Sequence, residues 1–251
     1  CAKIGAVAVT VNTNYKQAEL EYLCQNSDMH TLCIVNGDRG SDDYVNMVYA
    51  MLPELKSSQR GYLKSKRFPC MKNVIYIGQE KYRGMYNTSE ILLLGSNVED
   101  DELTEAKKQV DCHDTVNMQY TSGTTGFPKG VMLTHYNVVN DGKCIGDRMN
   151  LSTADRMMIQ VPMFHCFGMV LAMTASMTHG ATILPLPYFS PKPALSCINN
   201  ERVTAFHGVP TMFIAMLEHE DFPKTDFSYM RTGIMAGSPC PIAVMQDVVN
   251  K

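Results

Sequence analysis

The sequence predicts an α/β fold in which mostly parallel sheets are flanked by helices. Two observations lead to this prediction. Short apolar runs of strand length alternate with stretches of helical periodicity along the whole chain, which is typical of parallel sheets with helical crossovers. The chain also has 251 residues, of which 45% are hydrophobic, enough to bury the core of one large domain or two small ones.

In the first half, apolar runs predict the strands, and apolar side chains at helical spacing predict the helices. The longest predicted helix places Val45, Val48, Tyr49 and Leu52 on one face. The predicted strands are residues 6–11, 31–35 and 73–77, and the predicted helices are 16–24, 42–55 and 88–94. Residues 57–68 are expected to form an irregular polar loop, and residues 98–106 an acidic connection.

The second half repeats the alternation. A helix is predicted at 134–150, with Thr134 as its N-cap and a buried face that includes Gly142. The other predicted helices are 167–177, 193–199, 211–218 and 241–249, and the strands are 157–161, 182–186, 203–206 and 232–236. Met169, Met173 and Met177 recur every four residues of the helix at 167–177, and a core position is favoured for them over a ligand contact.

A subdomain boundary is predicted near Cys112-His113-Asp114, which divides the chain into a first α/β portion at 1–114 and a second at 115–251. The Cys-His-Asp sequence itself is interpreted as a boundary loop. Side chains that are adjacent in sequence rarely converge on one catalytic site.

Composition excludes several classes of protein. The net charge of −3 and the isoelectric point of about 6.2 give no indication of a nucleic-acid surface. The nine cysteines include no Cys-x-x-Cys pair, so a zinc site is not expected, and their odd number indicates reduced thiols in the cytoplasm. No apolar run reaches the roughly 18 residues that a transmembrane helix needs.

The most informative segment runs from Thr121 to Gly130 and combines glycines, hydroxyl side chains and a lysine. Glycine allows positive φ and a close approach of backbone amides to a ligand. The hydroxyl groups can donate to phosphate oxygens, and Lys129 adds a compact positive charge. The predicted ATP-phosphate loop consists of Thr121, Ser122, Gly123, Thr124, Thr125, Gly126, Phe127, Pro128 and Lys129.

The sequence around this loop disfavours two other interpretations. A flexible surface turn is disfavoured because alternating residues at 116–120 and apolar residues at 131–133 predict strands on both sides. A Walker A loop is disfavoured because Phe127-Pro128 separates Gly126 from Lys129, and because a strand follows instead of a helix. The amides, the hydroxyl groups and Lys129 would then bind phosphate without the help of a helix dipole.

Residues 120–137 read Tyr-Thr-Ser-Gly-Thr-Thr-Gly-Phe-Pro-Lys-Gly-Val-Met-Leu-Thr-His-Tyr-Asn. This segment resembles the AMP-binding signature of the adenylate-forming superfamily. That superfamily contains acyl-CoA synthetases, luciferases and peptide-synthetase adenylation domains. Residues 162–168, 208–213 and 231–239 extend the resemblance, which is greatest to medium-chain fatty acyl-CoA synthetases. The resemblance implies part of the large N-terminal domain of an enzyme that joins a carboxylic acid to CoA with ATP and Mg²⁺.

The resemblance also implies roles for residues outside the loop. His165 would lie near the carboxylate and the phosphates, although a packed core histidine is the alternative. Gly237, Ser238 and Pro239 would pack on the adenine ring, and Ser238 could also cap the helix that follows. The residues assigned to the acyl pocket are His165, His207, Gly208, Met235 and Ala236.

Two sequence details bear on the substrate. Amino-acid-activating relatives carry an aspartate near the position of His165, whereas residues 162–168 contain no carboxylate, so an acid without an amino group is favoured. Acyl-CoA synthetases of this branch commonly have an aromatic residue such as tyrosine where this chain has His207. A purely structural role for His207 is equally consistent with the sequence.

The resemblance further predicts that the chain is a fragment. In the family, the motif with the magnesium-binding Glu, a ribose-binding Asp and a C-terminal domain with the adenylation lysine follow beyond the position of Lys251. The metal ligand is therefore expected outside this chain, and the fragment alone is expected to be inactive. Two alternatives stay open: an acyl-AMP ligase that loads a carrier protein, and a non-catalytic nucleotide-binding module.

Overall fold

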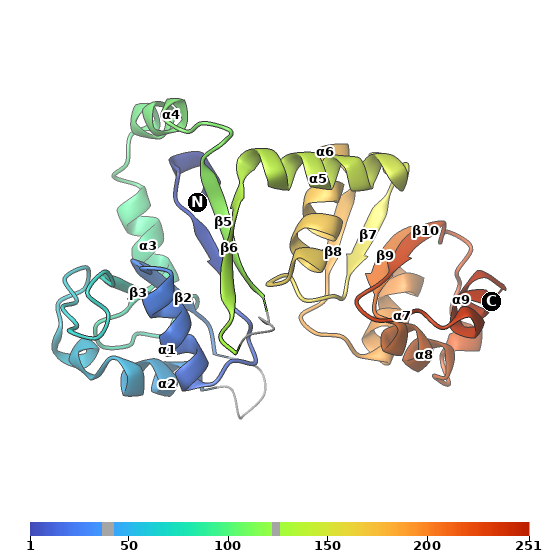
Figure 1. The fold of residues 1–251 in the computed structure, drawn as a ribbon, viewed down its shortest axis with the longest axis horizontal. Coiled ribbons are helices and arrows are strands. Elements are labelled where there is room, and N and C mark those ends of the chain that lie inside the picture. Colours follow the sequence, from blue (N-terminus) through green and yellow to red (C-terminus); the bar gives the residue numbers. More distant parts are fainter. Residues whose placement is uncertain (37–42, 122–125, 251) are drawn as a thin grey trace. The chain divides into compact units, whose positions relative to one another are not determined.

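The computed structural model describes residues 1–36, 43–121 and 126–250 of the protein. The chain divides into two compact units, and each is described by itself (Figure 1). Unit 1 comprises Cys1–Val110 and Tyr120–Gly130, and unit 2 comprises Asp111–Gln119 and Val131–Lys251. Two of the sheets described below, one of three strands and one of four, consist of parallel strand pairs. This arrangement confirms the predicted α/β class with parallel sheets.

Unit 1 contains a sheet of order β2-β3-β4. Its strands are β2 (Thr31–Ile34), β3 (Asn73–Tyr76) and β4 (Tyr86–Asn87). Other elements of this part of the chain are η1 (Ala2–Ile4), β1 (Ala8–Thr10), α1 (Gln17–Asn26), α2 (Tyr44–Met51), η2 (Pro53–Ser57), α3 (Thr88–Gly95) and α4 (Asp100–Lys108). The core forms where apolar residues of α1, α2 and the sheet meet, and it includes Leu23, Val48, Met51 and Val74.

Two predictions for unit 1 were wrong in detail. The helix predicted at 42–55 is α2 followed by the 3₁₀ turn η2, because Pro53 lacks the N–H that would continue the α-helix. The predicted acidic connection at 98–106 is helix α4. Its acidic residues lie in the first turn and Lys107 and Lys108 in the last, which is the charge order that a helix dipole favours.

Unit 2 contains a four-stranded sheet of order β10-β9-β7-β8. Its strands are β7 (Arg156–Ile159), β8 (Thr182–Pro185), β9 (Ala205–Gly208) and β10 (Thr232–Met235). The helical elements of this part of the chain are α5 (His135–Arg148), η3 (Phe167–Thr174), α6 (Ala175–His179), α7 (Pro191–Glu201), α8 (Pro210–Leu217), η4 (Phe222–Lys224) and α9 (Ile242–Asn250). A further sheet has the order β1-β5-β6, with β5 at Thr115–Thr121 and β6 at Lys129–Thr134.

Both faces of the four-stranded sheet are buried. Met157 and Ile159 belong to a cluster with residues of η3 and α6, whereas Met158 belongs to a cluster with residues of α7 and α8. Successive side chains of a strand point to opposite faces, so β7 contributes to both clusters. A parallel sheet covered on both faces explains why its strands read as continuous apolar runs in the sequence.

Helix α5 begins and packs as its sequence predicts. The Thr134 side chain accepts a hydrogen bond from the amide of Asn137 at 3.1 Å, which confirms the predicted N-cap. Gly142 and Gly146 are buried where the helix meets η3 and α6. A Cβ atom at Gly142 would lie 2.7 Å from the Thr174 side chain, so only glycine allows this close packing.

Replacing Gly146 by alanine is expected to lower the free energy of unfolding by about 1–3 kcal/mol, because the new Cβ would overlap the His179 ring. Urea denaturation would measure the loss. Gly95→Ala is the matched control, since nothing surrounds a Cβ at that position. Equal stability of the two variants would contradict the packing argument.

The segment predicted as a regular helix at 167–177 is a π-helix, η3, followed by the short helix α6. Met169 and Met173 lie in η3, whereas Met177 lies in α6, so the three residues do not belong to one continuous helix. Met169 is buried in this segment, whereas Met177 is 66% exposed. The prediction that the three methionines form one core stripe was therefore wrong for Met177.

Candidate active site

The predicted phosphate loop is described at its two ends, both of which lie in unit 1. Strand β5 ends at Thr121 and β6 begins at Lys129, which confirms the two flanking strands. Ser122, Gly123, Thr124 and Thr125 lie outside the described residues. Gly126 has φ = +110°, a conformation that side-chain-bearing residues rarely adopt. A glycine is therefore required at this position of the loop.

Phe127 and Lys129 are exposed in the outgoing part of the loop, and 71% of the Phe127 surface is accessible. Within the described part of the chain, no carboxylate lies within ion-pair distance of the Lys129 ammonium group. An exposed ammonium group without a neighbouring acid can bind an anionic ligand without first giving up an internal partner. The geometry is therefore compatible with phosphate binding.

A second group of predicted site residues lies in unit 2, at the carboxyl ends of β7, β9 and β10. In the β9–β10 register, Ile234 is opposite His207 and Met235 is opposite Gly208. Just beyond the strands, the amide of Ala236 donates to the carbonyl of Gly208 at 3.2 Å. The structure thus brings His207, Gly208, Met235 and Ala236 together. Open α/β sheets bind ligands at this edge.

His165 lies in the turn between β7 and η3 and is exposed, so it is not a packed core histidine. Its Nδ1 atom accepts a hydrogen bond from the amide of Phe167 at 3.1 Å. This bond requires an unprotonated Nδ1, so the proton of the neutral ring is on Nε2. None of the described residues is hydrogen-bonded to Nε2, which can therefore donate to an oxygen of a ligand.

The turn that carries His165 depends on a glycine. A Cβ atom at Gly168 would lie 2.5 Å from the carbonyl oxygen of Pro162, so a larger residue would displace the chain around His165. The backbone of this turn is held by the amides of Gly168 and Met169, which donate to the His165 carbonyl at 3.1 and 3.0 Å. These contacts fix the position of His165 at the start of the π-helix.

His207 is completely buried, and both of its ring nitrogens are hydrogen-bonded. Nδ1 accepts from the amide of Ile234 at 3.1 Å, and Nε2 donates to the carbonyl of Leu171 at 3.0 Å. The ring also stacks on Phe167, with centroids 5.4 Å apart. His207 therefore connects β9, β10 and η3. This geometry favours the structural role that the sequence left open, and a direct contact with the acyl group stays a prediction.

Burial lowers the pKa of His207, although its backbone hydrogen bonds act in the opposite direction. The unfolded chain therefore binds a proton at this residue before the folded chain does. Below about pH 6.5, stability from this residue is lost with a slope of at most about 1.4 kcal/mol per pH unit. Urea unfolding at pH 7.5 and 5.5 should show a smaller difference for His207→Gln than for wild type. The control His30→Gln, at an exposed position, should retain the wild-type difference.

Gly237, Ser238 and Pro239 form an exposed turn directly after β10. Gly237 has φ = +91°, and a Cβ atom there would lie 3.0 Å from the Val209 side chain. The turn therefore needs glycine, and it lies against the residue that follows β9. Helix α9 begins only at Ile242, so the alternative role of Ser238 as its N-cap was wrong. The thiol of Cys240 instead closes the turn by donating to the Met235 carbonyl at 3.3 Å.

Sequence reasoning missed Gln160, which follows β7 and is buried beside the same strand ends. Its Nε2 atom donates to the carbonyl of His207 at 3.2 Å, while its Oε1 atom has no partner among the described residues. The only signal in the sequence is a polar residue at the end of an apolar strand. Gln160 thus ties β7 to β9 beneath the predicted acyl-pocket residues.

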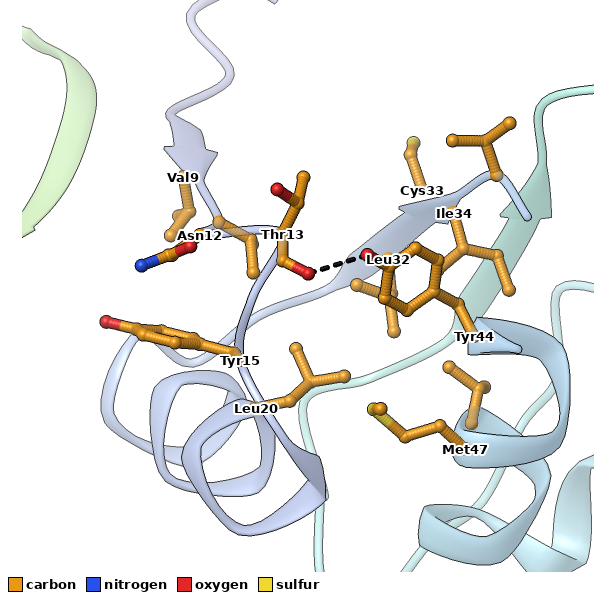
Figure 2. Close-up of a pocket in the computed structure, with 13 residues that line it drawn as sticks. Val9, Asn12, Thr13, Tyr15, Leu20, Leu32, Cys33, Ile34, Tyr44 and Met47 are labelled. Carbon is orange, nitrogen blue, oxygen red and sulfur yellow. Dashed lines mark hydrogen bonds between the residues drawn. The ribbon is translucent and has the colours of Figure 1, made fainter. Parts of the chain in front are cut away.

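A separate apolar pocket of about 260 Å³ lies in unit 1 (Figure 2). Figure 2 shows Leu20, Leu32 and Met47 converging on it, while the Tyr44 hydroxyl donates to the Thr13 carbonyl at 2.6 Å across one side. The residues that line this pocket include none of the predicted site residues. The pocket and the predicted phosphate loop are thus different features of unit 1.

The whole chain, residues 1–251, matches the family described as AMP-binding enzyme. The chain belongs to the AMP-binding enzyme family. This assignment confirms the resemblance on which the site prediction rests. The roles of the individual AMP-binding residues are not tested by the match and stay predictions.

Relatives within the AMP-binding family carry related names. YngI of Bacillus subtilis, a protein named provisionally as an acyl-CoA synthetase, is 50% identical over 250 residues, which are 100% of this chain and 45% of YngI. The human mitochondrial medium-chain acyl-CoA ligase ACSF2 is 36% identical over 256 residues, covering 100% of this chain and 41% of ACSF2. The chain thus spans less than half the length of these curated relatives.

The fold is also that of solved AMP-binding enzymes. The crystal structure of the anthranilate CoA ligase AuaEII with anthranoyl-AMP superposes with a TM-score of 0.74 at 22% identity, covering 96% of this chain and 42% of AuaEII. At this identity the likeness supports the fold alone. Within the described residues, no helix is both long enough and apolar enough to cross a membrane.

Proposed function

We propose that the whole protein is an acid–thiol ligase that forms an acyl-AMP from a carboxylic acid and ATP, and then passes the acyl group to CoA. The observation that carries this proposal is the identity of 50% and 36%, over the entire chain, with relatives named acyl-CoA synthetase and medium-chain acyl-CoA ligase. The exposed Lys129 in a loop of the AMP-binding signature supports it.

In the proposed first step, an oxygen of the substrate carboxylate attacks the α-phosphorus of ATP. The bond from the α-phosphorus to the bridging oxygen breaks, which gives acyl-AMP and pyrophosphate. Lys129 and the amides of the loop would stabilise the charge on the phosphates, while the Nε2 proton of His165 would orient a carboxylate or phosphate oxygen. Positioning and charge stabilisation are the main contributions that a protein makes to such transfers.

In the proposed second step, the sulfur of CoA attacks the acyl carbonyl and AMP leaves, so that a thioester replaces the mixed anhydride.

Gly237, Ser238 and Pro239 would contact adenine. Mg²⁺, when bound, would neutralise phosphate charge, and it prefers oxygen ligands such as carboxylates. The residues proposed for the nucleotide carry no carboxylate, so none of them is assigned to the metal.

We propose a fatty acid without an amino group as the substrate. Residues 162–168, around His165, contain no carboxylate of the kind that would balance a substrate ammonium group. Met235 and Ala236, beside Gly208 at the sheet edge, would form part of an apolar wall.

A cytoplasmic location also stays a proposal. All nine cysteines belong to the described residues and are free thiols, which is compatible with a reducing compartment.

A panel of acids, scored by pyrophosphate release from the whole protein, tests this proposal. Release with fatty acids and not with amino acids is the expected result. CoA-thioester formation in the same reactions separates the ligase from an acyl-AMP ligase that loads a carrier protein. ATP binding without pyrophosphate release for any acid would favour a non-catalytic nucleotide-binding module and contradict the proposal.

A further inference from the structure

Helix α1 contacts both described ends of the phosphate loop. The Tyr22 ring stacks on Phe127, with centroids 5.1 Å apart and an angle of 26° between the planes. The Tyr22 hydroxyl donates to the carbonyl of Pro128 at 3.0 Å. One turn further along α1, the Asn26 side chain accepts from the hydroxyl of Tyr120 at 2.7 Å. Pro128 directly precedes Lys129, and Tyr120 directly precedes Thr121.

Helix α1 is anchored well enough to serve as a support. Leu20, Leu23 and Cys24 bury its other face in the core of unit 1. Its first turn is closed by the Glu19 carboxylate, which accepts from the amide of Lys16 at 2.6 Å. Tyr22 and Asn26 are four residues apart, so they lie on one face of the helix, one above the other. The residues at both described ends of the loop therefore contact the same anchored helix, α1.

We propose that Tyr22 and Asn26 are positioning residues for nucleotide use, an inference that rests on the function proposed above for the loop. Neither residue belongs to the AMP-binding signature segment at 120–137. They act through the loop backbone: the Tyr22 hydroxyl fixes the peptide group before Lys129, and its ring covers one face of Phe127. Asn26 holds Tyr120, the residue that directly precedes the loop.

The physical reason is preorganisation. An exposed lysine has many rotamers and an exposed loop has many backbone conformations, and both must be restricted when a phosphate binds. Contacts that already hold Tyr120, Phe127 and Pro128 in the free protein reduce this cost, and the gain appears as affinity for ATP. A neutral hydrogen bond of this kind corresponds to a factor of about 5 in an equilibrium constant.

The test uses the whole protein, with pyrophosphate release as the readout at a saturating acid concentration. Tyr22→Phe removes the hydroxyl and keeps the stacked ring, and we expect it to lower kcat/KM for ATP about fivefold. Tyr22→Phe combined with Asn26→Ala should lower it about 20-fold, and KM for the acid, measured separately at saturating ATP, should be unchanged. Tyr49→Phe is the matched control. Its hydroxyl on α2 also donates to a backbone carbonyl, that of Arg83 at 2.9 Å, but away from the loop residues named here.

A double-mutant cycle with Lys129→Ala shows whether Tyr22 acts through the loop. In the Lys129→Ala background, Tyr22→Phe should cost less than about twofold, because the charge that it positions is gone. If Tyr22→Phe behaves like Tyr49→Phe, or if its effect is undiminished beside Lys129→Ala, the positioning role is wrong. If Lys129→Ala itself leaves kcat/KM for ATP unchanged, the function proposed for the loop fails instead, and the inference fails with it.

Discussion

Lys129→Ala is expected to weaken ATP binding by about 10- to 100-fold, because a charge-assisted hydrogen bond to phosphate contributes about 1.5–3 kcal/mol. The Lys129 side chain is exposed, and no acid among the described residues competes for it. Its loss should therefore remove a ligand contact without disturbing an internal ion pair. Isothermal titration calorimetry with ATP, on the wild-type chain and on the variant, measures the difference.

Two further variants make the Lys129 result specific. Lys66→Ala removes the same charge from another exposed position of unit 1 and should leave ATP affinity within about twofold of wild type. Lys129→Arg retains the positive charge and should recover part of the affinity. If Lys129→Ala and Lys66→Ala weaken binding equally, the effect is one of net charge, and Lys129 is not a phosphate ligand.

Arg231→Ala is expected to lower the free energy of unfolding by about 3 kcal/mol, because it leaves a buried carboxylate without its cation. The Asp155 side chain is 4% exposed and accepts from Arg231 through both oxygens, at 2.8 and 2.7 Å. The guanidinium group also donates to the carbonyls of Met149 and Asn150, each at 2.8 Å. Urea denaturation of wild type and variant measures the loss.

Arg156→Ala provides the matched control for Arg231→Ala. Arg156 forms an ion pair with Glu201 at 2.6 Å, but the two side chains are 35% and 48% exposed. Exposed ion pairs contribute about 0–1 kcal/mol, so this variant should lose much less stability. Equal losses would show that burial of Asp155 does not set the energy of the Arg231 pair.

The same pair predicts a loss of stability in acid. Burial alone would raise the pKa of Asp155, but the hydrogen bonds from Arg231 and Thr204 outweigh it and lower the pKa from 3.8 to about 2. As the pH falls, the unfolded chain therefore takes up this proton first. A stabilisation of about 2 kcal/mol, complete above about pH 4, should be lost between about pH 4 and pH 2. Asp155→Asn should lack this part of the acid transition.

Local sequence was sufficient for much of the fold and for the family. The strand before the phosphate loop, the N-cap at Thr134 and the buried glycine at 142 all follow from patterns within a few residues. The charge arrangement of α4 was also present in the sequence but was interpreted as a loop. The helix has only two apolar side chains, Leu103 and Ala106, which are three residues apart and only partly buried, so its acidic residues dominated the sequence interpretation.

Several contacts of the site and of the fold join residues far apart in the sequence. Tyr22 and Pro128 are separated by 106 residues, and Arg231 and Asp155 by 76. His207 is paired with Leu171 and Ile234 only because β9 lies beside β10 in the sheet, close to the π-helix. No local pattern predicts which strand lies beside which.

The sequence by itself therefore determined the alternation of strands and helices and membership of the AMP-binding family, and it predicted a phosphate-binding role for the loop from Thr121 to Gly130. Only the tertiary structure decided that His207 is a buried, doubly hydrogen-bonded ring, that His165 is exposed, and that α1 contacts the residues at the described ends of the loop. The physical reason is that capping, turn formation and periodicity depend on neighbours along the chain. Strand order, burial and hydrogen-bond partners depend instead on the packing of distant segments, whose free energy is set by the complete fold.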